Sequence, residues 1–257
     1  MKLTNIIKEE YQDINETIFE KEKNTEKTNQ MRDALLLVWN SRKKNGIETS
    51  RYKPITNEKS YETSYKIVEQ MSYDRSALSA FCFAIDPSNE KKSNISFSIF
   101  TSALMNAQYK KEKRNNSALV NNSYIITVKH FQNTIDYFGF LLDGPRVEIL
   151  GDLGDWTGSS MRKGKITIYG NSHDCCGFSM IGGTIFVKEN TGKFTGLSMK
   201  GGKIEIVGNS KDYTGNAMDG GVIRVSGTIA GIGNNYFTNQ NIKRGKIYEK
   251  EQSVFSR

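Results

Sequence analysis

A fixed step of nineteen residues constrains this chain more than any other feature of its sequence. Four columns keep that step without a slip: Val147, Ile166, Ile185, Ile204 and Ile223; Gly158, Gly177, Gly196 and Gly215; Met161, Met180, Met199 and Met218; Gly164, Gly183, Gly202 and Gly221. Four sets of residues with the same nineteen-residue spacing cannot result from amino-acid composition alone. The second half of the chain therefore repeats one small unit of structure.

Each unit contains one short strand. Runs such as Ile166-Thr167-Ile168 alternate between aliphatic and other residues, which is the period of a strand, and they are too short for a helix. A leucine-rich repeat has a similar length but needs several leucines per unit, and residues 147–223 contain only three. The sequence therefore predicts a right-handed, single-stranded parallel β-helix with 19-residue coils.

In such a coil, equivalent residues of successive units lie one above another, about 4.8 Å apart. We expect the isoleucine and methionine columns to fill the interior and the glycine columns to form corners. A further column holds Asp152, Asn171, Asn190 and Asn209, whose side chains we expect to bond along the axis as an amide ladder.

The ends of the array follow from the same step. Counting back nineteen residues from the glycine, acidic and aromatic columns gives Gly139, Asp136 and Tyr137, which are residues of the expected types. The array should therefore begin near Tyr124, with His130 in an inward column. At the other end, Gly245 follows Gly221 by 24 residues, which indicates a five-residue insertion before the last coil. Roughly six coils would give a rod of about 25–30 Å.

Glycine also divides the chain into two parts. Of 23 glycines, only Gly46 lies in residues 1–122. We therefore predict an α+β protein with a mainly helical domain of unknown role at 1–122 and the β-helix at 123–257. The polar residues 110–116 and 121–123 should form the linker.

Apolar spacing predicts the helices of the first part. The expected helices are a first at about residues 5–23, a second that carries Met31, Leu35 and Val38, a third that carries Tyr61, Tyr65, Val68 and Met71, and a fourth at 101–109. Residues 76–85 and 95–109 are apolar enough to be buried, but their pattern alone does not separate strand from helix. Aromatic residues at helical spacing are usually core, so Tyr61 and Tyr65 are interpreted as packing residues rather than a recognition surface.

Composition excludes several classes of protein. The longest apolar run, Ala34–Trp39, is too short to span a membrane, and the N-terminus lacks the features of a secretory signal, so we expect a cytoplasmic protein with no membrane contact. Three cysteines cannot form a disulfide framework. The net charge of +8 is shared equally between the two parts and does not form a basic arm.

The repeat resembles the GXGXG β-helix found as the C-terminal domain of the glutamate synthase large subunit, and it is similar to the GXGXG-containing chain of formylmethanofuran dehydrogenase. Gly151, Gly154 and Gly158 carry the signature, whereas later coils have His173 or Lys211 in place of the middle glycine and Glu189 in place of the first. The resemblance covers about residues 124–250. It implies a structural element without catalytic residues, which organises catalytic domains or subunits.

Three motifs that could carry chemistry have simpler interpretations. The segment from Gly158 to Ile166 has the wrong spacing for a phosphate-binding loop. The run His173-Asp174-Cys175-Cys176 contains metal-capable side chains, but neighbours in an extended segment project in different directions. A carboxylate column of Asp155, Asp174 and Asp212 could serve acid–base catalysis, yet Lys193 interrupts it, and a solvated edge is the simpler account.

A basic column precedes the strands, and it is the candidate interaction surface. It comprises Arg146, Lys165, Lys203 and Lys246, with Arg162, Lys163 and Lys200 one short loop away. Such a stripe could meet an acidic protein or a phosphate backbone. Because it lacks interleaved aromatic residues and is diluted by Thr184 and Val222, a solubilising edge is the favoured interpretation and nucleic acid the less favoured partner.

The sequence thus favours a non-catalytic scaffold or protein-interaction subunit, with a protein partner or a second copy and with the helical region as another contact surface. It assigns no catalytic, cofactor-binding or metal-binding residue. The alternative is a subunit of a one-carbon or glutamate-metabolism oxidoreductase complex, with its chemistry on another chain or within residues 1–122. Exposed end coils should be capped by the helical region or by another copy.

Overall fold

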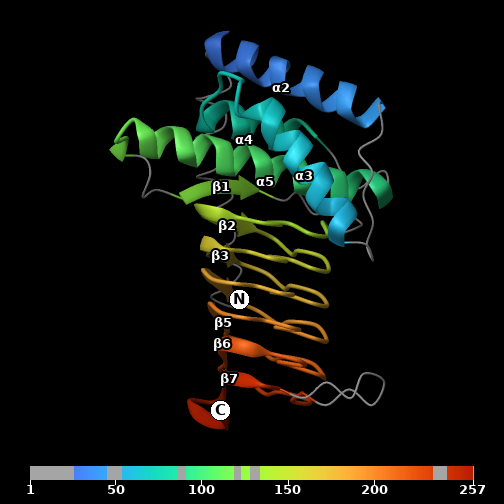
Figure 1. Ribbon diagram of the computed structural model, residues 1–257, viewed down its shortest axis with the longest axis vertical. Helices are drawn as coiled ribbons and strands as arrows, with labels where there is room; N and C mark the ends of the chain where they lie inside the picture. Colours follow the sequence, from blue (N-terminus) through green and yellow to red (C-terminus); the bar gives the residue numbers. More distant parts are fainter. Residues whose placement is uncertain are drawn as a thin grey trace, which may run out of the picture.

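The computed structural model describes residues 26–44, 54–85, 91–118, 123–127, 134–233 and 242–256. In these ranges, helices come first and one sheet follows, and the helices lie together at one end of a long β-solenoid (Figure 1). The helices are α2 (Glu26–Lys44), α3 (Pro54–Val68), α4 (Arg75–Ala84) and α5 (Lys91–Arg114). The α+β prediction is confirmed.

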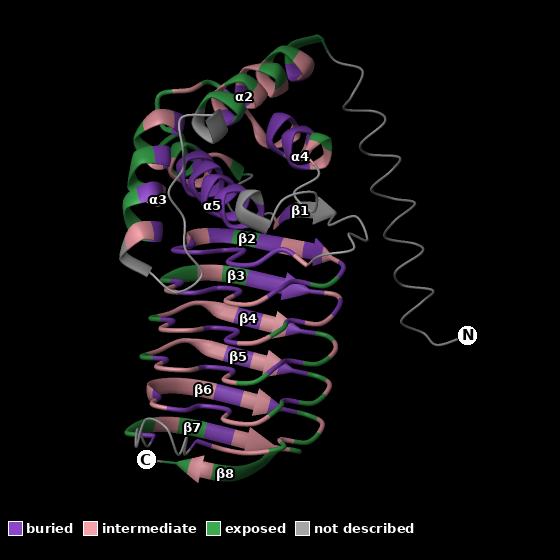
Figure 2. Ribbon diagram, turned by 90° about the vertical axis from the view of Figure 1, so that its right-hand side faces the viewer, coloured by how far each residue is buried: buried purple, intermediate pink, exposed green. Residues whose placement is uncertain are grey.

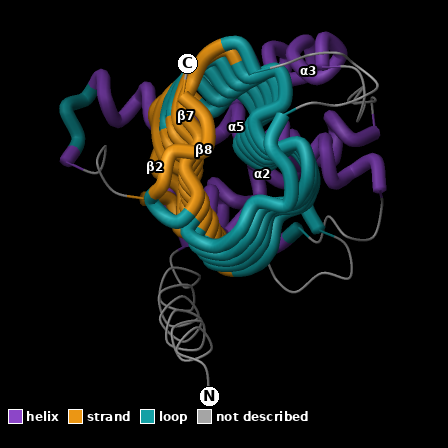
Figure 3. The backbone as a smooth tube through the Cα atoms, turned by 90° about the horizontal axis from the view of Figure 1, so that it is seen from below, coloured by secondary structure: helices purple, strands orange, loops and turns teal. Residues whose placement is uncertain are grey.

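The sheet has eight strands whose order in space is their order in sequence. They are β1 (Ser123–Thr127), β2 (Asp143–Leu150), β3 (Lys163–Ile168), β4 (Thr184–Val187), β5 (Lys203–Ile206), β6 (Asp219–Val225), β7 (Arg244–Glu249) and β8 (Gln252–Ser256). Strands β1 to β7 pair in parallel, one strand per coil, and only β8 turns back to pair antiparallel with β7. The chain winds as a right-handed β-helix (Figures 2 and 3), as predicted, with about five turns where roughly six were expected.

The strand register keeps the predicted step in the middle of the array. Ile166, Ile185, Ile204 and Ile223 are successive partners, each nineteen residues from the last. At the start, however, Ile126 pairs with Ile149, a separation of 23 residues. The spacing between the first two strands is therefore longer than the nineteen residues of the later coils. His130, which was expected to share the inward column of Ile149, is outside the described residues.

Packing inside the tube explains both glycine columns. Gly177 has a φ of +71°, and a Cβ there would overlap the Cδ1 of Ile204 in the next strand but one. Gly202 has a φ of +87°, and a Cβ there would lie 2.8 Å from the Cε of Met180. Since the methionines of this column are fully buried, each fills the space that the glycine of a later coil leaves open. The methionine column thus lies in the interior of the tube.

Helix α5 closes the first end of the tube. It lies next to β2 at the end of the solenoid (Figure 2), and its polar residues supply what a preceding coil would have supplied. The Asn94 side chain accepts a hydrogen bond from the backbone N of Asp136 at 2.9 Å and donates to the carbonyl of Thr134 at 2.6 Å. Asn106 accepts from the backbone N of Asp143 and donates to the carbonyl of Leu141. These amides satisfy backbone groups that would otherwise be buried without partners.

A charged pair joins two helices to the first strand. Arg75 of α4 donates to both carboxylate oxygens of Glu112 on α5, at 2.7 and 2.6 Å, and its guanidinium lies 4.1 Å from the ring centre of Tyr124 on β1. Glu112 is 5% exposed. The bidentate geometry fixes the orientation of the helices relative to the solenoid, because a fork of this kind tolerates little misalignment.

The helical predictions are confirmed with changed boundaries. Residues 76–85 and 95–109 are both essentially helical, and α3 ends before Met71. The linker prediction is wrong for residues 110–114, which continue α5 because Glu112 is held by Arg75. Tyr61 and Tyr65 stack on each other and pack against the core. The helix expected at 5–23 is outside the described residues.

Of the helices that are described, none is long and apolar enough to cross a membrane.

Candidate functional site

The basic column lies on the solenoid as a row with one residue per coil. Strand pairing aligns Arg146, Lys165, Thr184 and Lys203, and continues through Val222 to Lys246. Arg146, Lys165 and Lys246 are exposed. Lys203 differs, because its Nζ lies 2.6 Å from the carboxylate of Glu205 and its charge is partly neutralised. The row is thus strongest at its two ends.

The turn that precedes the row adds further positive charge. Arg162, Lys163 and Lys200 are all exposed there. An acid in this turn, Asp219, has a pKa below its usual value, first because Arg244 donates a hydrogen bond to it at 2.8 Å and then because Lys243 and Lys200 lie near. The lowered pKa therefore comes mainly from the single contact with Arg244.

The acidic column ties one coil to the next. Asp136 Oδ1 accepts from the backbone N of Asp155, Asp155 Oδ1 accepts from the N of Asp174, and Asp174 Oδ1 accepts from the N of Lys193, at 2.9, 3.1 and 2.7 Å. A solvated edge was the simpler expectation. The structure gives these carboxylates a specific structural role, since each accepts a backbone hydrogen bond from the following coil.

The amide column does the same at the neighbouring position. The oxygens of Asp152, Asn171, Asn190 and Asn209 each accept from the backbone N nineteen residues later, at 2.7–3.1 Å. Bonds between side chains also occur, from Asn171 Nδ2 to Asp152 and from Asn190 Nδ2 to Asn171. The predicted ladder exists, and its main partner is the backbone of the next coil.

The run from His173 to Cys176 does not converge. His173 is exposed and Asp174 half-buried, whereas Cys175 and Cys176 are buried, and burial raises the pKa of their thiols to about 12 and about 11. Among the residues that the structure describes, no group of three His, Cys, Asp or Glu side chains could hold a metal ion. Cys176 occupies a column that holds threonine in three other coils, at Thr157, Thr195 and Thr214.

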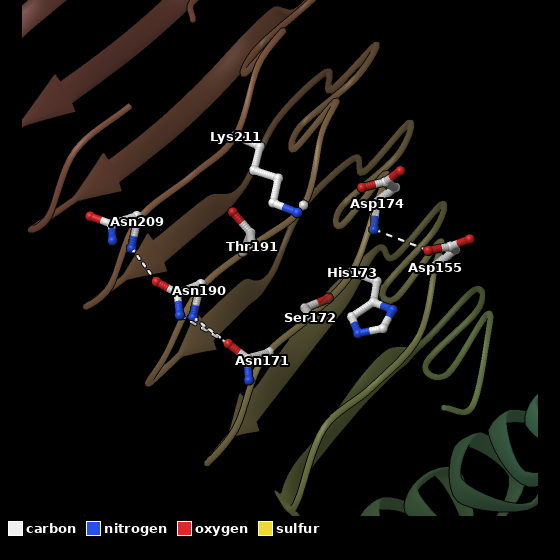
Figure 4. Close-up of a pocket in the computed structure, with 10 residues that line it drawn as sticks. Asp155, Asn171, Ser172, His173, Asp174, Asn190, Thr191, Asn209 and Lys211 are labelled. Atoms are coloured by element: carbon white, nitrogen blue, oxygen red, sulfur yellow. Dashed lines mark hydrogen bonds between the residues drawn. The ribbon is translucent and has the colours of Figure 1, made fainter. Parts of the chain in front are cut away.

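Between the acidic and amide columns runs a groove of about 580 Å³ (Figure 4). Asn190 and Asn209 stand on one side, and Asp155 and Asp174 on the other. The side chains of His173 and Lys211 lie between these walls. Hydrogen-bond donors and acceptors therefore face one another across an open, polar channel parallel to the axis of the tube.

The sequence pattern does not predict this groove. Its only sequence signal is the middle corner position, which reads Gly154, His173, Gly192 and Lys211 in successive coils. Taken alone, that departure from glycine indicates no more than an irregularity of the repeat, but the structure shows that the two substituted side chains enter the same groove. In comparisons with known proteins, no family model, no curated protein and no solved structure matches the chain.

Proposed function

We propose that this chain is a non-catalytic scaffold or protein-interaction subunit of the cytoplasm. It would present the basic surface, defined as Arg146, Arg162, Lys163, Lys165, Lys200, Lys203 and Lys246, to an acidic face of a partner protein or of a second copy.

One observation carries the proposal: strand pairing sets the basic residues in one row along the solenoid, interrupted at Thr184 and Val222, with further basic residues just before it. Arg146 and Lys165 are backbone partners, so their spacing is fixed by the sheet rather than by flexible loops. Fixed charges at regular spacing favour recognition of a partner with complementary charge.

The fate of the other reactive side chains supports a structural role. The carboxylates of Asp136, Asp155 and Asp174 are engaged with the backbone of the next coil, and the thiol of Cys176 is buried. These are the residue types from which a catalytic set would have been built. In this chain the carboxylates link neighbouring coils, and the thiol is packed in the interior.

A second candidate function follows from the resemblance to GXGXG β-helices. In that case the chain would be a subunit of a one-carbon or glutamate-metabolism oxidoreductase complex, and another chain would supply the chemistry. Both candidates assign a docking role to the solenoid. They differ in the partner, which would be a redox enzyme subunit in the second case.

Charge reversal tests the basic surface. We expect the triple variant Arg146→Glu, Lys163→Glu and Lys165→Glu to lose the proteins that the full chain retains in affinity purification from native lysate, identified by mass spectrometry. Its matched control is the pair Lys193→Glu and Lys211→Glu, because both residues are exposed on the same solenoid but outside the basic surface.

Retention of the same partners by the triple variant would refute the proposal, as would turnover of a small molecule by the purified chain alone. Recovery of nucleic acid in place of protein, with affinity that falls steeply as salt rises, would show that the stripe binds phosphate backbones instead.

A further inference from the structure

We infer that the groove between the amide and acidic columns is a binding site for a neutral oligosaccharide of two or three pyranose units. The site lies apart from the basic surface, so it stands whether or not that surface docks a partner. Three features of the groove support it: the chemistry of the two walls, their spacing along the tube and the irregular corner column.

The two walls have opposite hydrogen-bonding character. On the amide side, the oxygens of Asn190 and Asn209 are taken by the following coil, so the groups left for a ligand are Nδ2 donors, of which Asn190 already gives one hydrogen to Asn171. On the acidic side, Asp174 Oδ1 accepts a hydrogen bond from the backbone N of Lys193, and the second oxygen of the carboxylate can accept further hydrogen bonds. A hydroxyl group both donates and accepts, so a ligand rich in hydroxyls can satisfy both walls at once.

Charge argues against an anionic ligand. Asp155 and Asp174 line the groove together, and they would repel the phosphates of a nucleic acid or the carboxylates of an acidic peptide. The ammonium group of Lys211 supplies a single opposing charge and can donate to a hydroxyl oxygen. A neutral ligand avoids the cost of this repulsion.

The spacing distinguishes a sugar chain from a peptide. Side chains on successive coils recur at about 4.8 Å along the axis, which is close to the length of one pyranose unit in an extended chain. An extended peptide rises about 3.3 Å per residue and presents the same side every second residue, at about 6.6 Å, which does not match the coil step. The groove spans the three coils of Asn171, Asn190 and Asn209, enough for two or three rings.

The corner column shows how the groove is shaped. A Cβ at Gly192 would overlap the Oδ1 of Asp174, so no side chain fills the groove at this position. On the coils before and after it, the longer side chains of His173 and Lys211 line the groove. Because Gly192 lies between His173 and Lys211 in this column, a ring seated over it would lie between these two side chains. Such alternation of small and large side chains creates a pocket along an otherwise uniform ladder.

Binding of defined neutral trisaccharides to the full chain tests the inference. The probes are cellotriose, maltotriose and mannotriose, measured by saturation-transfer NMR and isothermal titration calorimetry. We expect at least one to bind with one site per chain. Asp174→Asn keeps the Oδ1 acceptor for Lys193 and replaces the second oxygen by a donor, so it should weaken binding by about tenfold or more.

Two further variants keep the fold and separate the outcomes. Lys211→Gly restores the residue found at Gly192 in the same column, and we expect it to weaken binding as well. Asp212→Asn is the matched control, because Asp212 shares the acidic column but does not line the groove, and its affinity should equal that of the parent chain. Melting temperatures of all variants verify the fold.

Failure of all three probes would overturn the inference, as would equal loss in Asp174→Asn and Asp212→Asn. Tighter binding of trigalacturonate than of every neutral probe would show an anion site at Lys211 instead. None of these results depends on the basic surface, because the charge-reversed triple variant should bind the sugar unchanged.

Discussion

The residue type at many positions of this solenoid is determined by contacts with side chains and backbone groups of neighbouring coils. Gly177 is glycine because its backbone is left-handed and because the Ile204 side chain occupies the space of a Cβ. Asp174 is acidic in a column that reaches the backbone of the following coil. Residues nineteen apart therefore behave as direct neighbours, as residues four apart do in a helix.

Gly177→Ala should destabilise the protein by about 2–5 kcal/mol, because a left-handed alanine and an overpacked interior both raise the free energy of the folded state. Urea unfolding followed by circular dichroism measures the change. Gly231→Ala is the control, since a Cβ there comes no closer than 3.3 Å to a neighbouring atom and the backbone is not left-handed. Equal losses in both variants would contradict the packing argument.

Buried thiols make the folded state sensitive to alkali. The pKa of Cys176 rises from 9.0 to about 11 on burial, so the folded state keeps a proton that the unfolded state releases. This contribution to stability is complete below pH 9.0 and is lost as the pH rises towards about 11. The melting temperature should therefore fall across that window, and fall less in Cys176→Thr, which follows the threonine of the other coils. An identical fall in both proteins would disprove the assignment.

At the scale of elements, α5 takes the place of a missing coil. Asp136 N would meet the oxygen of an acidic-column residue if another coil preceded it, and Asn94 supplies that oxygen from a helix. In the same way, the side-chain oxygen of Asn106 accepts a hydrogen bond from the backbone N of Asp143 at the other end of the turn. The helix thus supplies, at these two positions, the hydrogen-bonding groups that a preceding coil would have supplied.

Asn106→Leu should cost about 2–4 kcal/mol, because the backbone N of Asp143 and the carbonyl of Leu141 would stay buried without a partner. Chemical denaturation measures the loss. Asn115→Leu, exposed just beyond the end of α5, is expected to change stability by less than about 0.5 kcal/mol. A small effect at both positions would show that water replaces the cap.

Contacts that repeat along the solenoid could be predicted from the sequence, whereas contacts between the helices and the solenoid could not. The columns of Met180 and Gly177 were visible because each residue repeats its own environment every nineteen positions. The roles of Asn94 and Asn106 were not, since they depend on contacts between a helix and a corner about forty residues away, which no period encodes. The groove escaped for a related reason: its walls come from different columns that meet only once the tube is wound.

At the scale of the whole molecule, the two ends of the tube are closed unequally. Helices α4 and α5 contact β1 and β2 and share a core with them. The other end carries β8, a strand of five residues that is mostly exposed and bulged against β7. Stability in a solenoid is a sum of contacts between neighbours, so the helical end should be the firmer one.

Hydrogen exchange should follow this gradient. We expect the slowest amide exchange in α5 and in β2 to β4, and the fastest exchange of any strand in β8, with β7 next. Mass spectrometry of exchanged peptides reports it directly. Uniform protection along the solenoid would mean that the array opens as one cooperative unit, and faster exchange at α5 would reverse the gradient.

The unbroken step between Lys165 and Val222 gives this architecture adjustable length. Excision or duplication of nineteen consecutive residues in that stretch would keep every column in register, since the strands pair with the same offset in each coil. The distance from the helical cap to the far end could then change by one rung at a time, about 4.8 Å, without redesign of either end. Tandem copying of a short gene segment would be sufficient to lengthen such a protein.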